Sequence, residues 1–576
     1  MKKIIAAIPL LLAFLLTIVL SIKCMREPDI WWQIRTGQWI LELHQVPTTD
    51  PFSYTFFGKD WINIKWGFEV LAALIAKYLG PESIFILQII ASCLILWLFI
   101  RILKLNNHYH PVVFLIGTIV LLFGIEYRMN GRPEMFSHLF MVAFLYLLLL
   151  YHQSSSKWVW LVVPIQLLWT NLHEAYGLGI VILLLFTLGS WLENYKENKA
   201  KAIQLSLVTL ASIIAIILNP RGIILLLQPL NIFNQVQQNK FTTELDAIWT
   251  SNYWQKEAWV LIVCIALLVI YLFKTKKLKS ALKELGLGYF ITLLAMLFLG
   301  FTAYRNIIFF LLFAFPLLII TLYHFIPKDS KMQTIAIGIG FLFYLSIVSN
   351  VYYNKFRPRD HYGLEVLSIN NPSGAAQYIT QKKLQSKKCF SDYLTSSYLL
   401  WYLQPDFKTY IDLRDLDVFP TSFFNQYLQE SEIPDKFHAL DLKEKFDYVV
   451  LFRNNHPNLH AYLYNDSIYA CTYIDAVAAV YEKTDEFTRD DIFTPCKPIE
   501  SSAFAITLST LFKPTYTTYD YDALNTDFEA AAYYLTVFQP SKAEKRINQY
   551  LALYPDNTQA QNIKNQIIDL KSRNKN

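Results

Sequence analysis

The feature that most constrains this chain is a series of apolar stretches, each near the length of a membrane-spanning helix, that recur between Ile4 and Val351. A helix needs about 20 apolar residues to cross about 30 Å of hydrocarbon, where only helices and closed barrels satisfy every backbone polar group. With 54% hydrophobic residues among 576, the chain is also too apolar for an ordinary soluble enzyme. We therefore expect an α-helical polytopic membrane part over residues 1–352, followed by a water-soluble part.

Eleven of these stretches are expected to span the membrane, starting with the amino terminus inside. The first follows two lysines without a small-residue cleavage pattern, so we interpret it as a retained helix rather than a signal peptide. The stretch Trp66–Leu79 is shorter than a span and is interrupted by Glu69 and Lys77, which predicts an interfacial helix. The expected spans lie near residues 4–22, 84–101, 111–126, 135–151, 158–171, 176–192, 203–219, 258–273, 286–302, 306–325 and 333–351.

The net charge of +6 does not indicate a nucleic-acid partner. The lysines and arginines gather in the short loops that this topology places inside, such as Lys274–Lys283, as the positive-inside rule requires. An odd number of spans places the carboxyl-terminal part outside, together with a large first outer loop at residues 23–83. The outer face receives most of the unusual polar residues.

The first outer loop begins with Glu27-Pro28-Asp29-Ile30-Trp31-Trp32, and Arg35 and Asp50 follow in the same loop. Carboxylates at a bilayer edge are costly unless they are paired, hydrated or functional. Here they suit a site that deprotonates a hydroxyl beside a sugar ring, because aromatic rings pack on sugar faces. An aromatic belt with a few charges is the alternative interpretation. A divalent cation at Glu27, Asp29 and Asp50 is a further option, although no metal-binding motif is present.

Other outer loops supply arginine and a His-Glu pair. Arginine binds phosphate with a planar fork of donors, which suits a lipid-phosphate leaving group, whereas a single helix-end arginine is ordinarily a snorkelling residue. His173 and Glu174 interrupt an apolar stretch and predict an acid/base or substrate contact; a helix break that satisfies its own polar groups is the alternative. The arginines at the outer ends of different spans are Arg128, Arg132, Arg221 and Arg305.

These motifs resemble the GT-C superfamily of membrane glycosyltransferases, in particular the protein-mannosyltransferase and aminoarabinose-transferase-like branch and its uncharacterised bacterial relatives. The resemblance is carried by EPDIWWQIRTGQWIL, VPTTDPFSYTFFGKDWINIKWGFEVL, GRPEMFSHLF, LWTNLHEAYGLG, LNPRG and AYRNIIFFLLFAFPLL. It implies a polyprenyl-phosphate-linked sugar donor and makes Asp29 the catalytic carboxylate, with Glu27 where the bacterial group more often has aspartate. Gln33 replaces the usual histidine of that group, and the adjacent Asp-Glu pair of protein mannosyltransferases is absent.

We therefore expect a glycosyltransferase of the bacterial cytoplasmic membrane that moves a hexosyl or pentosyl unit on the extracytoplasmic side. Asp29 would act as the base, the arginines would hold the donor phosphate, and Glu27, Asp50 and His173 would orient the reacting groups. The acceptor is a glycan, a lipid or a protein. The alternatives are an O-antigen polymerase or ligase, a transporter, and a non-enzymatic membrane anchor that displays a binding domain.

The water-soluble part is expected to hold an α/β domain over residues 353–515. Its predicted strands are 408–413 and 446–452, and its predicted helices are 375–383 and 396–403. Asp412, Arg414 and Asp415 form either a binding site or an ion-paired turn.

The last segment, residues 516–576, resembles a tetratricopeptide unit that caps the α/β domain or docks a protein partner. Cysteine usage adds one further expectation for the outer part of the chain. A disulfide is possible among Cys24, Cys389, Cys471 and Cys496.

Overall fold

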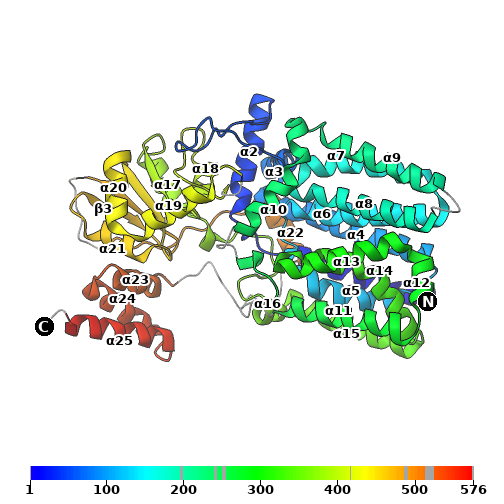
Figure 1. The fold of residues 1–576 in the computed structure, drawn as a ribbon. Helices are drawn as coiled ribbons and strands as arrows, with labels where there is room; N and C mark the ends of the chain where they lie inside the picture. Colours follow the sequence, from blue (N-terminus) through cyan, green and yellow to red (C-terminus); the bar gives the residue numbers. More distant parts are fainter. Residues whose placement is uncertain are drawn as a thin grey trace.

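The computed structural model describes residues 2–194, 199–238, 243–249, 255–414, 417–484, 491–512 and 525–573. It consists of a helical bundle, an α/β domain at one end of the bundle, and three carboxyl-terminal helices beneath that domain (Figure 1). The amino terminus lies at the bundle end that faces away from the α/β domain (Figure 1). We call the end of the helical bundle that lies nearer the α/β domain the domain end.

Each expected span overlaps a helix, but fewer than the eleven expected are long enough to cross a membrane, because the described apolar helix Ala7–Ser21 and the helix Val162–Leu172 are shorter. Within the described ranges, eight helices are long and apolar enough to cross a membrane, and nine if the bent pair α12 (Leu278–Leu285) and α13 (Leu287–Thr302) forms one span. The chain is therefore a multi-pass membrane protein. The other bundle helices are α1 (Lys2–Ser21), α4 (Phe85–Leu105), α5 (Pro111–Ile125), α6 (Glu134–Ser154), α7 (Val162–Leu172), α8 (Gly177–Asn194), α9 (Lys199–Ile216), α11 (Lys256–Val269), α14 (Ile307–Phe325) and α15 (Ser330–Val348).

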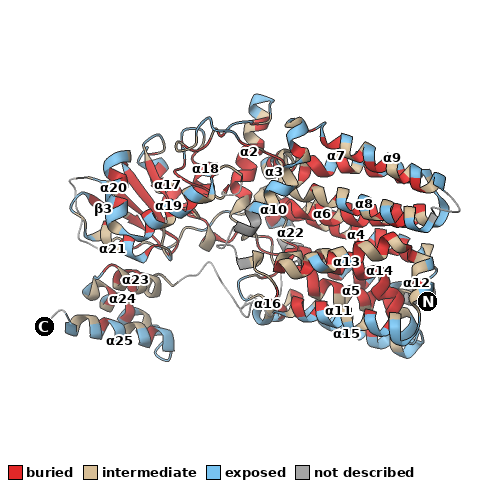
Figure 2. Ribbon diagram, in the orientation of Figure 1, coloured by how far each residue is buried: buried red, intermediate tan, exposed pale blue. Residues whose placement is uncertain are grey.

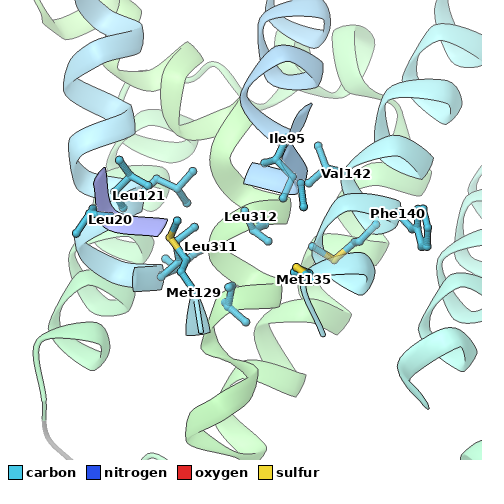
Figure 3. Packing of buried hydrophobic residues seen from close by; sticks show 14 of the residues in the cluster. Leu20, Ile95, Leu121, Met129, Met135, Phe140, Val142, Leu311 and Leu312 are labelled. Carbon is cyan, nitrogen blue, oxygen red and sulfur yellow. The ribbon is translucent and has the colours of Figure 1, made fainter. Parts of the chain in front are cut away.

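Helix α14 is the centre of the bundle. It packs against α4, α5, α6, α11 and α13. In the apolar 18-residue stretch of this helix 78% of the residues are buried, compared with 17% in the corresponding stretch of the peripheral helix α15. Figure 3 shows Leu311 and Leu312 of α14 among side chains of α1, α4, α5 and α6. Figure 2 shows the outward faces of α15 as exposed, which suits a helix in contact with lipid.

The first loop folds into two helices at the domain end, α2 (Asp29–Leu43) and α3 (Trp66–Leu79). The expected helix at Trp66–Leu79 has the same bounds as α3. The two helices pack closely at Gly37, where an added Cβ would lie 1.9 Å from the backbone oxygen of Glu69. This close approach fixes the amino-terminal end of α2, where Asp29 is located.

The α/β domain contains a four-stranded sheet in the order β1-β2-β4-β3, in which β1 and β2 are parallel and the other pairs are antiparallel. The prediction of a strand at 446–452 matches β2, and that of a helix at 396–403 matches α18. The expected strand at 408–413 is wrong, because that segment makes only an isolated bridge, from Thr409 to Ser53 of the first loop. The strands are β1 (Cys389–Ser391), β2 (Tyr448–Phe452), β3 (Tyr469–Ile474) and β4 (Ala478–Lys483). The helices are α17 (Ser373–Gln381), α18 (Ser396–Tyr402), α19 (Thr421–Glu432), α20 (Pro434–Glu444) and α21 (Pro457–Asn465).

The carboxyl-terminal helices dock on the α/β domain. Arg453 forms an ion pair with Glu529, and the hydroxyl groups of Tyr481 and Tyr533 lie 2.8 Å apart. None of the six cysteines, all of which are described, forms a disulfide, so the expected bridge among Cys24, Cys389, Cys471 and Cys496 is absent. The docked helices are α23 (Thr526–Thr536), α24 (Pro540–Leu553) and α25 (Thr558–Arg573), and the remaining helices are α10 (Gln228–Gln238), α16 (Val351–Phe356) and α22 (Ala503–Phe512).

Candidate functional site

A cavity of about 1020 Å³ lies where the domain end of the bundle meets the first loop and the α/β domain. One wall is apolar and comes from α8, α10, α13 and α14, with Val181, Leu230, Leu299 and Phe309 among its residues. The rest of the lining is largely charged. Its charged residues are Asp29, Lys65, Arg128, Arg132, Glu134, Glu174, Glu244, Asp246, Arg305 and Asp417.

The structure brings together a subset of the residues that the sequence singled out. The acidic motif after the first span, two arginines of the next outer loop, the His-Glu pair and the arginine before α14 share this cavity although they are far apart in the chain. The predicted site residues that line the cavity are Asp29, Arg128, Arg132, His173, Glu174 and Arg305.

Asp29 begins α2, so its carboxylate lies at the positive end of the helix dipole. Arg132 lies with Nη2 3.4 Å from Asp29 Oδ2 and also pairs with Glu27. Burial lowers the pKa of Arg132, but the carboxylates of Glu27 and Asp29 outweigh it and raise this pKa well above its ordinary value. Glu27 lines a smaller adjoining cavity of about 40 Å³, which it shares with Asp29.

Two further arginines differ in their partners. Arg128 lies between Glu134 and Glu244, with Nη1 2.6 Å from Glu244 Oε2. Arg305 follows the last residues of α13 and lines the cavity, and within the described part of the chain its guanidinium has no hydrogen-bond or ion-pair partner. Arg305 is therefore the guanidinium available to an anionic ligand.

The hydrogen bonds around His173 fix its tautomer. Trp169 Nε1 donates to Ser137 Oγ over 2.6 Å, and Ser137 Oγ lies 2.6 Å from His173 Nδ1. The backbone N–H of Ala175 points at the same Nδ1 over 3.4 Å. Burial lowers the pKa of His173 to about 4, so the ring is neutral near pH 7 and carries its proton on Nε2. His173 therefore offers a hydrogen-bond donor to the cavity.

The α/β domain lines the cavity through Asp417, which forms an ion triad with Lys65 and the predicted residue Glu174; sequence reasoning missed Lys65 and Asp417. Lys65 Nζ lies 2.5 Å from Glu174 Oε1 and 3.1 Å from Asp417 Oδ2. Burial raises the pKa of Asp417 to about 6. Lys65 precedes the apolar residues of α3, and that position resembles a snorkelling lysine in the sequence.

His138 is another cavity residue that sequence reasoning missed. Its side chain is 4% exposed and its ring forms no hydrogen bond to any residue placed in the structure. One signal was present in the sequence, because Glu134 and His138 are spaced to share one face of α6 within an otherwise apolar span.

Arg35, Arg221 and Asp50 are predicted site residues but bind other partners outside the cavity. Arg35 lies 3.5 Å from Glu42 and over the ring of Phe52. Arg221 binds Asp60, with the nearest atoms 2.7 Å apart.

Asp50 has no side-chain exposure and lies 2.7 Å from Arg414, which also binds Asp412. Asp415 of the expected cluster lies outside the described residues. Asp50 does not join Glu27 and Asp29, and over the described ranges no group of three or more His, Cys, Asp or Glu side chains is arranged to hold a metal ion.

No protein-family model and no curated protein sequence matches the chain. Its structure is similar to the archaeal oligosaccharyltransferase AglB from Archaeoglobus fulgidus, solved with an inhibitory peptide and a dolichol-phosphate, with TM-score 0.54 and 11% identity over 81% of this chain and 72% of that chain. ArnT from Cupriavidus metallidurans, solved with undecaprenyl phosphate, aligns with TM-score 0.49 and 11% identity over 85% of this chain and 99% of that chain. The likeness to AglB confirms the expected GT-C fold.

Proposed function

We propose that this chain, which has the GT-C fold, is a membrane glycosyltransferase that transfers a hexosyl or pentosyl unit from a polyprenyl-phosphate-linked donor to an acceptor on the extracytoplasmic side. The observation that carries the proposal is the composition of the cavity. It combines a carboxylate at a helix terminus, an arginine without a carboxylate partner in the described ranges, and an apolar wall.

The donor phosphate is assigned to Arg305. The other cavity arginines are already neutralised by carboxylates, so a phosphate gains the most from Arg305, whose guanidinium has no partner among the described residues. The Nε2–H of His173 can donate to the same anion. The apolar wall beside Arg305 suits a prenyl chain, because burial of its carbons there removes them from water.

Asp29 is assigned as the general base. Its carboxylate takes the proton of an acceptor hydroxyl while that oxygen attacks the anomeric carbon, and the bond from this carbon to the phosphate oxygen breaks. The leaving phosphate carries the electron pair away as an anion that Arg305 stabilises. A direct displacement of this kind inverts the configuration at the anomeric carbon.

The experiment compares Asp29→Asn with Glu42→Gln, a change to an exposed carboxylate on the same helix. Each variant is returned to a deletion strain, and envelope glycans and lipids are measured by mass spectrometry. We expect the sugar modification to be lost on deletion, restored by Glu42→Gln, and reduced about 100-fold or more in Asp29→Asn. Membrane insertion and protein level serve as the control for folding. Normal modification in Asp29→Asn would remove the catalytic assignment.

The same experiment separates this proposal from a non-enzymatic membrane anchor. An anchor that displays the α/β domain as a binding module does not depend on the charge of Asp29, and the α/β domain alone would restore the phenotype. An O-antigen polymerase or ligase remains the second candidate, and it is favoured if the deletion changes only the length or attachment of a lipid-linked polysaccharide.

A further inference from the structure

Glu174 and Asp417 share one cation, Lys65, at the place where the bundle, the first loop and the α/β domain meet. The side chains of Glu174, Asp417 and Lys65 are 23%, 15% and 11% exposed, and all three residues line the cavity. Among the residues that the structure describes, Lys65 is the one cation within ion-pair distance of both carboxylates, and Arg305 and Arg414 act on them from farther away.

The two carboxylates retain unused hydrogen-bonding capacity. An ionised carboxylate has about four lone-pair sites. Among the described residues, only the ammonium group of Lys65 donates a hydrogen bond to the carboxylates of Glu174 and Asp417. Since the groups are mostly shielded from bulk water, the free lone pairs are available to donors of a molecule inside the cavity.

A second observation also points to a ligand in this cavity. His138 is 4% exposed and lines the cavity, yet its ring forms no hydrogen bond to any described residue. The ring of His138 lines a cavity large enough to hold water or a ligand, so its nitrogens are available to a molecule bound there.

We infer that Glu174 and Asp417, bridged by Lys65, form a subsite for the hydroxyl groups of a neutral sugar ring. Sugar hydroxyls are donors, which the carboxylates can accept, whereas the phosphodiester of a polyprenyl-phosphate-linked sugar offers only acceptors, which the carboxylates cannot bind. The inference rests on the proposed function and extends it to the sugar. The ring belongs either to the donor or to a glycan acceptor.

The α/β domain is then part of the recognition site. The backbone N–H of Asp417 donates to the Arg414 carbonyl oxygen over 3.0 Å, and the Arg414 side chain is held by Asp50 of the first loop. Asp417 therefore has a fixed position relative to Lys65 and Glu174.

The test uses Glu174→Gln and Asp417→Asn. Each change removes one of two carboxylates and leaves Lys65 paired with the other, so both variants are expected to fold. Thermal unfolding in lipid nanodiscs checks this, and Glu42→Gln is the matched control outside the cavity. An amide keeps the shape of the side chain but accepts fewer hydrogen bonds.

Two probes are measured by native mass spectrometry: undecaprenyl phosphate, which has no sugar, and the lipid extract of the deletion strain, in which an unused sugar-loaded donor accumulates. If the subsite binds the donor sugar, both variants bind undecaprenyl phosphate like the wild type and bind the sugar-loaded lipid about tenfold more weakly. If it binds the acceptor, both lipids bind normally, and transfer falls with a raised KM for the acceptor.

Two results overturn the inference. One is transfer by both variants at the wild-type rate and KM. The other is tighter binding of undecaprenyl phosphate, which would mean that the carboxylates restrain Lys65 from a phosphate. Failure of the proposed function is distinguishable, because the wild type would then bind neither lipid or Asp29→Asn would retain transfer.

Discussion

Glu69 in α3 is a carboxyl group without any exposed surface. Asn63 Nδ2 donates to its Oε2 over 2.6 Å, while Oε1 has no hydrogen-bond partner in the described structure. Burial raises the pKa of Glu69 to about 8. The side chain is therefore largely protonated at neutral pH, and α3 carries one negative charge fewer beside Lys65 than the sequence indicates.

This protonation predicts a pH-dependent stability that Glu69→Gln removes. The pKa of Glu69 is about 8 in the fold and near 4.5 when exposed, so its contribution is complete below pH 4.5 and is lost as the pH rises through 8. The loss amounts to a few kcal/mol, on the order given by 1.36 kcal/mol per pKa unit. Thermal unfolding at pH 5, 7 and 9 should show a falling Tm for the wild type and a flatter profile for Glu69→Gln. Parallel profiles for the two proteins would contradict this.

Single residues also show what the sequence could predict of the site. Arg221 and Arg305 look alike in the sequence, as arginines at the outer ends of spans. In the structure the Arg221 guanidinium pairs with Asp60, whereas the Arg305 guanidinium has no partner among the described residues. The apolar stretches predict the spans, and the charge of the loops predicts the side of the membrane on which each arginine lies. Which carboxylate neutralises which cation depends on packing between distant segments, and it cannot be obtained from local patterns.

At the scale of elements, the close contact between α2 and α3 controls the position of Asp29. Gly37→Ala places a Cβ 1.9 Å from the backbone oxygen of Glu69, which forces the two helices apart. We expect a loss of about 1–3 kcal/mol in stability, from overpacking, and reduced transfer because α2 moves with Asp29 at its first turn. Gly338→Ala in α15 is the matched control, since an added Cβ there has no atom within 4 Å. Equal Tm values for the two alanine variants would show that α2 and α3 adjust freely.

The elements that the sequence predicted well are those whose own residues determine them. Each expected span is a helix because an apolar stretch in lipid must satisfy its backbone internally. Residues 408–413 have a strand-like pattern, but Thr409 instead pairs with Ser53 of the first loop. Contacts with a segment more than 350 residues away in the sequence override the local preference there.

At the scale of the whole molecule, the first loop and the α/β domain form one continuous unit. Bridges join Met25 to Val366 and Ser53 to Thr409, and Trp31 Nε1 donates to Asn371 Oδ1 over 2.5 Å. The α/β domain is therefore attached to the segment that carries Asp29, and it contributes a wall of the same cavity. A separately folding module on a linker would not place Asp417 against Lys65.

The pair formed by Asp50 and Arg414 is the buried charge pair of this junction, and its loss should affect both stability and transfer. Arg414→Met leaves Asp50 and Asp412 without a cation in a site that has no exposed side-chain surface. Breaking such a pair costs about 3–5 kcal/mol, and Asp417 loses its fixed position beside Lys65. Arg414→Lys should recover part of the loss, because the charge remains while the planar fork of donors is lost.

Arg573→Met is the control, since Arg573 forms an exposed pair with Asp569. Thermal unfolding and limited proteolysis between the first loop and the α/β domain measure the effect, and wild-type behaviour of Arg414→Met in both would show that the domain is positioned by other contacts.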